Sequence, residues 1–154
     1  MSYAILKFVH VLSSTLLFGT GIGSAYYLLR AALDGTPQTV ARVAQWVVVA
    51  DWLFTATTMM LQPLSGWYLA HAAHFPLDRG WLPWSIALYG VALACWLPVV
   101  WLQMRMRDLA RAAAAANAPL PLRFRRLFVL WCALGAPALF AFVAVFYLMV
   151  AKPM

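Results

Sequence analysis

Four long apolar stretches occupy most of this 154-residue chain and restrict what it can fold into. They cover residues 4–29, 43–69, 82–104 and 127–150, and each can cross a hydrocarbon core of about 30 Å, which takes about 20 helical residues. A bilayer holds no water to bind backbone N–H and C=O groups, so only helices or closed barrels span it. The stretches lack the period-two alternation of barrel strands. The sequence therefore predicts an all-α, integral membrane four-helix bundle with up-down topology.

The composition supports one membrane domain over residues 1–154. Apolar residues make up 66% of the chain and charged residues 10%, against roughly 25% charged in soluble proteins. The connections are too short for a separate catalytic domain. The first stretch lacks a basic leader and exceeds the usual apolar length of a signal peptide, so we expect it to stay as a helix. Cys95 and Cys132 lie inside spans, where thiols usually pack as small hydrophobes.

The net charge of +7 acts as a topology signal, because the basic residues flank the spans. This argues against nucleic acid as a partner and for a lipid bilayer. The alanine-rich segment after Met104 predicts that the third helix projects about three turns into the cytoplasm and ends near Asn117. The side with the first and third connections carries eight lysines and arginines, and the opposite side carries Lys7, Arg79 and Lys152. The positive-inside rule then places both termini and the connection 70–81 outside the cytoplasm.

His10 is the first candidate for chemistry, because ionisable groups within spans are costly and usually functional. Four residues follow it at helical spacing, and most of them are small: Ser14, Leu17, Gly21 and Ser24. Such small residues let a neighbouring helix approach closely, and His10 would then bond across the bundle. The alternative is a groove that leaves room for a flat cofactor beside a ligating imidazole, with Ser14 and Gly21 lining it.

His71 and His74 lie at the outer end of the second span, on the same side of the membrane as His10. Two histidines at similar depth on adjacent helices are how a bundle holds haem b through both axial positions. His10 and His71 are therefore candidate ligands of a haem iron. The other interpretation is that His71 and His74 are interfacial residues that contact water.

A polar stripe follows one face of the second span, at offsets of 0, 4, 7, 11 and 14 residues: Asp51, Thr55, Thr58, Gln62 and Ser65. This face should point into the bundle, because unpaired polar groups are costly in lipid. The third span offers a complement at near-helical spacing in Ser85, Tyr89, Trp96 and Gln103. The stripe serves either interhelical hydrogen bonding or a proton or substrate path toward His10.

Asp51 differs from the rest of the stripe because a carboxylate inside a membrane needs compensation. Either a cation such as Arg42 or Arg105 pairs with it, or the carboxyl group stays neutral. Pro63 and Gly66 are expected to bend the same span, since a proline removes a backbone hydrogen bond.

The following segments resemble an uncharacterised bacterial inner-membrane family, a domain of unknown function: Leu6-Lys7-x-x-His10, Phe18-Gly19-Thr20-Gly21, Asp51-Trp52-Leu53-Phe54, Gln62-Pro63-Leu64-Ser65-Gly66 and the segment from Cys95 to Gln103. The resemblance implies four helices and an inner-membrane location. More distantly, Lys7-x-x-His10 resembles the HemJ-type protoporphyrinogen oxidases and the CopD-type copper-resistance membrane proteins. That likeness implies haem or metal handling by an early histidine.

The leading hypothesis is an inner-membrane redox or cofactor-binding protein that holds haem b through His10, with His71 as second ligand. Whether it is an enzyme stays open. The main alternative is a non-enzymatic membrane subunit or assembly protein whose grooves pack against itself or another membrane protein. A third is passage of ions or copper along the second span. Absorption in the visible range distinguishes haem from the other two.

The orientation gives the first testable prediction. A reporter fused after Met154 should be active when the reporter requires the periplasm and inactive when it requires the cytoplasm, because both termini are expected on the periplasmic side. The control is the same reporter inserted after Asn117, which should show the opposite behaviour. Cytoplasmic activity of the Met154 fusion would reverse the orientation.

Overall fold

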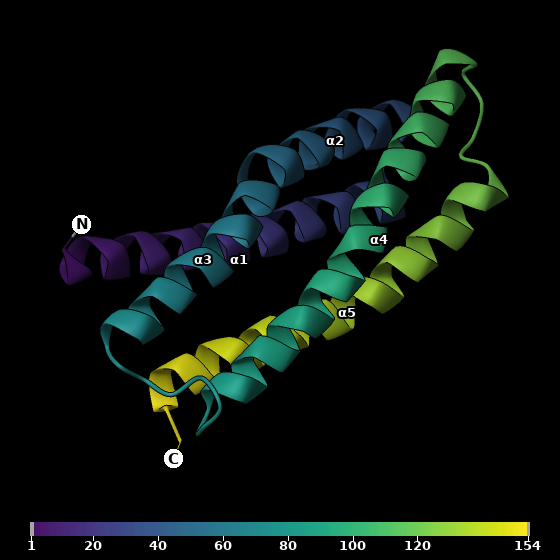
Figure 1. The fold of residues 1–154 in the computed structure, drawn as a ribbon. Helices are drawn as coiled ribbons and strands as arrows, with labels where there is room; N and C mark the ends of the chain where they lie inside the picture. Colours follow the sequence, from purple (N-terminus) through teal and green to yellow (C-terminus); the bar gives the residue numbers. More distant parts are fainter. Residues whose placement is uncertain (1, 154) are drawn as a thin grey trace.

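The computed structural model describes residues 2–153, which contain helices and no strands. The helices are α1 (Tyr3–Asp34), α2 (Pro37–Ala50), α3 (Ala56–Ala72), α4 (Leu82–Ala115) and α5 (Leu122–Ala151), and a π-helical segment, η1 (Asp51–Thr55), joins α2 to α3 (Figure 1). Because α2, η1 and α3 form one continuous helical rod, four rods are long and apolar enough to span a membrane. The predicted all-helical, four-span architecture is confirmed.

The helices extend beyond the predicted apolar spans, most of all at the arginine-rich end. The first helix continues from Leu29 to Asp34, the second begins at Pro37 and not at residue 43, and the fourth begins at Leu122 and not at residue 127. Hydropathy marks only the part of a helix that lies in hydrocarbon, whereas polar residues continue the same helix into water. The predicted extension of the third helix is confirmed, since α4 runs eleven residues past Met104 to Ala115.

Local capping chemistry explains where α2 begins and where α4 ends. The Thr36 side chain accepts a hydrogen bond from the backbone N–H of Thr39, and Pro37 occupies the first turn of α2, where its missing N–H costs nothing. Asn117 adopts a left-handed φ of 47° just after α4, a conformation that asparagine tolerates. Turn residues therefore separate the rods with short connections.

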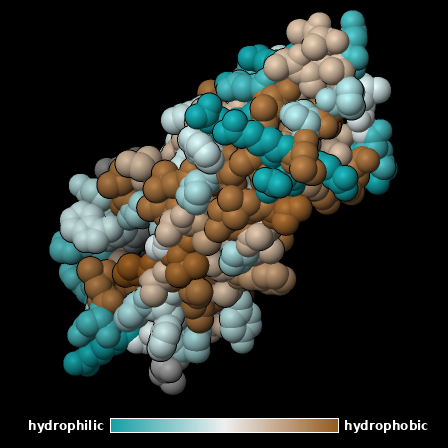
Figure 2. All heavy atoms as spheres, turned by 90° about the vertical axis from the view of Figure 1, so that its right-hand side faces the viewer, coloured by the Kyte–Doolittle hydropathy of each residue, from teal (hydrophilic) through white to brown (hydrophobic). Residues whose placement is uncertain are grey.

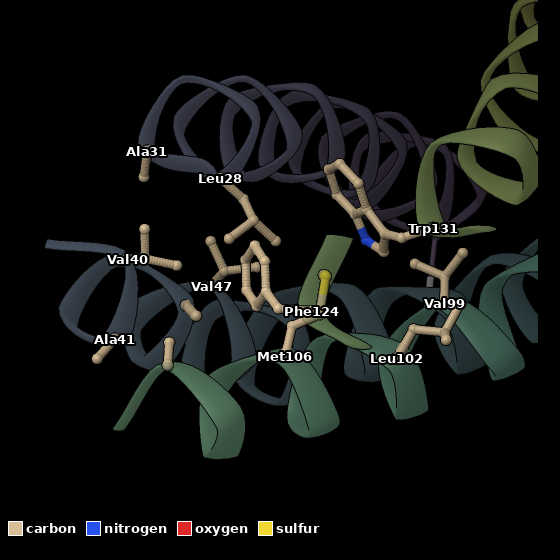
Figure 3. Packing of buried hydrophobic residues seen from close by; sticks show 12 residues of the cluster. Leu28, Ala31, Val40, Ala41, Val47, Val99, Leu102, Met106, Phe124 and Trp131 are labelled. Carbon is tan, nitrogen blue, oxygen red and sulfur yellow. The ribbon is translucent and has the colours of Figure 1, made fainter. Parts of the chain in front are cut away.

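A shared apolar core holds all four rods together in the arginine-rich half. Here α2 packs between α1 and α4, and α4 packs along α5 (Figures 1 and 3). Alanines at the contacts let the helix backbones approach closely. The core consists of Leu28, Ala31, Val40, Ala41, Ala44, Val47, Val99, Leu102, Met106, Ala110, Phe124 and Trp131.

Toward the end that carries His71 and His74, the rods separate into two pairs. α1 pairs with α3 and α4 pairs with α5, and the two pairs diverge in Figure 1. Contacts that bridge them include the Tyr89 hydroxyl, which donates to the backbone carbonyl of Met59, and the rings of Phe18 and Phe146, whose centroids lie 5.2 Å apart. The bundle is therefore closed at one end and divided at the other.

The outer surface suits a lipid environment. Figure 2 shows hydrophilic residues gathered at the arginine-rich end and apolar residues over the middle of the visible face. Large apolar side chains are exposed on all four rods, for example Phe8, Trp46, Trp84 and Phe140. An exposed apolar belt around four membrane-length helices is what contact with acyl chains requires.

The closed end gives a prediction about stability. Phe124 is 2% exposed and its ring stacks on Phe128, so Phe124→Ala should lower the free energy of unfolding by about 3 kcal/mol through the cavity it leaves. Thermal unfolding in detergent micelles measures this. The matched control is Leu122→Ala, two residues earlier in the same helix and 63% exposed, which should leave the midpoint almost unchanged. Equal effects of the two substitutions would show that this core does not stabilise the bundle.

Candidate functional site

The imidazole of His10 is bonded to α3 through a serine. His10 Nδ1 lies 2.7 Å from Ser65 Oγ, and the same hydroxyl lies 2.7 Å from the backbone carbonyl of Leu61. A carbonyl only accepts, so Ser65 donates its proton to Leu61, and His10 Nδ1 must then carry the hydrogen that Ser65 accepts. With the hydrogen on Nδ1, the neutral imidazole keeps a free lone pair on Nε2.

The backbone of α1 at His10 is also fixed to α3. The Gln62 amide nitrogen donates to the His10 carbonyl at 2.9 Å and to Ser13 Oγ at 2.6 Å. Ser13 in turn donates to the His10 carbonyl at 3.0 Å. Both hydrogens of the Gln62 amide are thereby used, and Gln62 and Ser13 are buried. The main chain that carries the imidazole is therefore held in place together with its ring.

Gly66 allows the ring to approach α3. A Cβ added at Gly66 would lie 3.3 Å from His10 Cε1, closer than most real contacts. The absence of a side chain thus lets the imidazole lie against the helix surface. The position of the His10 ring is thus determined by four residues on two helices: Ser13, Gln62, Ser65 and Gly66. We name these four residues and His10 the histidine group.

The other predicted cofactor residues on α1 lie outside the histidine group. The Ser14 hydroxyl donates to the carbonyl of Val11 in its own helix. A Cβ built at Gly19, Gly21 or Gly23 would meet nothing within 4 Å. These three glycines of α1 are therefore not used to bring another rod of the described chain close to α1.

His71, the predicted second ligand, lies on a different face of α3 from Ser65. Its ring is exposed and stacks on Trp67, with centroids 5.7 Å apart and planes 11° apart. It follows Ser65 by six positions, which is about 9 Å along a helix axis and about 120° around it. His74 is exposed, with a left-handed φ of 51°. Among residues 2–153 no group of three or more His, Cys, Asp or Glu side chains could hold a metal ion.

All five residues of the polar stripe are buried, and their hydrogen bonds fall into two sets. Gln62 and Ser65 belong to the histidine group and bond to residues of α1. Thr55 donates to a carboxyl oxygen of Asp51 at 2.9 Å, and the Thr58 hydroxyl donates to backbone carbonyls one turn earlier. Thr58 lies between the two sets, about one helical turn from Thr55 and from Gln62. The stripe therefore serves two different neighbours, which periodicity alone does not reveal.

Asp51, the first residue of η1, lies deep in the protein interior. It is 3% exposed, as is Gln103 of α4, whose side-chain amide lies beside the Asp51 carboxyl group. Thr55 bonds Asp51 Oδ1. Asp51 Oδ2 and Gln103 Oε1 are both buried and have no hydrogen-bond partner among the described residues. Each of these two oxygen atoms therefore lies in a dry interior without a hydrogen bond to the described residues. We name Asp51, Thr55 and Gln103 the carboxyl group site.

Neither arginine that the sequence suggested as a partner of Asp51 pairs with it. Arg42 is exposed, and the Arg105 guanidinium lies 5.5 Å from the ring centre of Trp101. Within residues 2–153 the ion pairs join other residues, for example Arg30 and Asp34 at 2.6 Å. Among the described residues, no cation therefore pairs with the Asp51 carboxyl group.

The π-helical segment that begins at Asp51 was not predicted. The backbone N–H of Ala56 bonds the carbonyl of Asp51, a wider turn than an α-helix makes. The Thr57 hydroxyl donates to the carbonyls of Leu53 and Phe54. Segments of this kind are rare and often occur at functional sites. The cluster of threonines after Asp51 is the only local signal for it.

The complement predicted on the third span contributes two residues across helices. Gln103 meets the buried carboxyl group, and Tyr89 bonds the carbonyl of Met59. The Ser85 hydroxyl instead donates to a carbonyl one turn earlier. The indole nitrogen of Trp96 is buried without a partner among the described residues.

The histidine group yields a prediction about helix pairing. Gln62→Leu keeps the shape of the side chain but removes both hydrogen bonds to α1, and should lower the free energy of unfolding by about 1 kcal/mol, a usual value for such bonds in membranes. Thermal unfolding in detergent measures the change. The control is Thr57→Val, whose hydroxyl bonds only its own helix. A larger loss in the control would show that Gln62 does not join α1 to α3.

Comparison with known proteins is consistent with this membrane architecture. No curated protein and no solved structure matched the chain. One family model matched residues 4–153, nearly the whole sequence, and it describes a predicted integral membrane protein. The expected membership of an uncharacterised membrane family is thereby confirmed. The chain belongs to the family of predicted integral membrane proteins named DUF2269.

Proposed function

We propose that this protein is a redox or cofactor-binding protein of the bacterial inner membrane that holds haem b through His10, with both termini on the periplasmic side. The observation that carries the proposal is the bond between His10 Nδ1 and Ser65 Oγ at 2.7 Å. A histidine that ligates iron through one nitrogen usually donates the other N–H to a nearby acceptor, which fixes the tautomer and orients the ring. Ser65 is such an acceptor, because its own proton is directed to Leu61.

The environment of His10 also suits a flat ligand beside α1. The ring is half-buried, and it is held from the α3 side by Ser65 and Gly66. Below it on α1, Gly21 has open space where a side chain would be. Ser14 lies one turn from His10 and presents a hydroxyl near the same stretch of helix. The likeness of Lys7-x-x-His10 to the HemJ-type and CopD-type proteins supports the same role for the histidine.

His71 is the candidate second ligand in this proposal. Its exposed ring contacts Trp67 of its own helix, so it would have to leave that stacking position and turn toward His10. Bound haem would supply one-electron redox chemistry at the iron. The residues of this chain would fix the ligating ring, through Ser65 and Gln62, and keep it within the apolar region.

The test is the visible absorption spectrum of the protein purified in detergent from haem-supplied cells. The wild type should show a Soret band, His10→Ala should lose it, and Ser65→Ala should bind less haem because the ring is no longer oriented. His74→Ala is the matched control and should retain the band. His71→Ala separates one protein ligand from two, since only a second ligand would change the position of the band. A colourless wild type that also fails to take up added haem would contradict the proposal.

A second candidate function is that of a non-enzymatic membrane subunit, which the open glycines of α1 favour. A side chain placed at Gly19, Gly21 or Gly23 would find no atom within 4 Å of its Cβ, and small residues in membranes allow close contact between helices. Another copy or another membrane protein would then cover this part of α1. A colourless protein that migrates as a stable complex in the same preparation would favour this function over haem binding.

A further inference from the structure

The divided end of the bundle carries a small cavity that two distant parts of the chain form together. The connection between α3 and α4 passes beside the end of α5 (Figure 1), and a Cβ added at Gly80 would lie 3.6 Å from the carbonyl oxygen of Pro153. Gly80 has a φ of 64°, which glycine adopts without steric cost. The cavity has a volume of about 300 Å³. Its lining residues are Phe75, Arg79, Gly80, Trp81, Lys152 and Pro153.

Two cations line this cavity, and no acidic residue among residues 2–153 does. Arg79 precedes α4 and Lys152 follows α5. The ion pairs within residues 2–153 lie in other parts of the chain, so neither cation has a carboxylate partner there, not even the neighbouring Asp78. A cleft lined by charges of one sign concentrates ions of the opposite sign. The electrostatics of the cavity therefore favour an anion.

Membrane topology does not account for the two cations. The positive-inside rule favours lysine and arginine on the cytoplasmic side, and this opposite end carries only Lys7, Arg79 and Lys152 of the eleven in the chain. Two of these three nevertheless line one cavity, although the sequence separates them widely. Cations that only extend into water need no shared cavity. Their convergence therefore points to a common ligand.

The remaining lining of the cavity is aromatic and apolar. The rings of Phe75 and Trp81 lie against each other, with centroids 5.6 Å apart and planes inclined by 45°. Three residues after Trp81, at the start of α4, Trp84 is 69% exposed. Tryptophan is enriched where the hydrocarbon core meets the headgroups. The cavity thus lies at headgroup depth, and its lining suits a ligand that has both an anionic group and an apolar part.

We propose that this cavity binds a phosphate group, supplied by the headgroup of an anionic phospholipid, through Arg79 and Lys152. The guanidinium of Arg79 presents paired N–H donors that match phosphate oxygens, and the Lys152 ammonium adds a compact charge. Basic pockets between membrane helices bind lipid headgroups of this class. The bound headgroup would join the connection after α3 to the end of α5. None of the lining residues belongs to the histidine group, so the proposal does not depend on haem.

Native mass spectrometry of the detergent-purified protein, titrated with phosphatidylglycerol or phosphatidylcholine, tests the proposal. Phosphatidylglycerol should bind more tightly, because the choline cation opposes two positive side chains. Arg79→Gln and Lys152→Gln should each lower its affinity about fivefold, and the double variant about 30-fold. Lys7→Gln is the matched control, since it removes an exposed charge from the same end but outside the cavity. The thermal unfolding midpoint without lipid should not change, because both substituted residues are exposed.

Isothermal titration calorimetry with inorganic phosphate distinguishes the two sources of the group. Binding of inorganic phosphate but not of phosphatidylglycerol, lost in the double variant, would overturn the lipid as the source and support a site for a soluble phosphate compound. Equal affinity of the wild type and the double variant for phosphatidylglycerol would overturn the whole proposal. An equal loss in Lys7→Gln would overturn it as well, because the overall charge of this end would then explain the binding.

Discussion

The absence of water inside the bilayer is the constraint on which the rest of this structure depends. It forces the backbone into four continuous helical rods, and it requires each buried polar side chain to find a partner within the protein. The second rod shows the consequence most clearly. Gln62 and Ser65 bond residues of α1, whereas Asp51 meets Gln103 of α4. One polar face thereby joins the rod to two neighbours at two depths.

The fold could be predicted well from the sequence because hydropathy and capping are local properties. Apolar length indicated the four spans, and Thr36 and Asn117 stand at helix boundaries as their chemistry suggests. What could not be predicted depends on contacts between distant segments. The closed core at one end, the divided pairs at the other and the π-helical turn at Asp51 all arise from packing. Hydropathy also underestimated helix length, since Asp34 and Pro37 lie in helix outside the apolar stretches.

The candidate site was predictable in its residues but not in its pairings. Helical spacing identified His10 and the polar stripe, yet it does not show that His10 bonds Ser65, 55 residues away in the chain. Counting depth alone also suggested His71 as a partner for His10. His71 lies about 120° around α3 from Ser65 and its ring lies on Trp67, so His71 has to reorient to share a ligand with His10. Depth and rotation around the axis both have to match before two side chains share a ligand.

The two polar sites lie on different helix pairs, and this has a mechanical consequence. The histidine group joins α1 to α3, and the carboxyl group site joins the second rod to α4. Between them along the rod, Tyr89 of α4 bonds the carbonyl of Met59. A movement of α4 that opened the space around Asp51 would therefore act first on the Tyr89 bond, while His10 would keep its contacts with α3. The bonds that hold the imidazole join α1 to α3, so a change in the contacts of α4 leaves them in place.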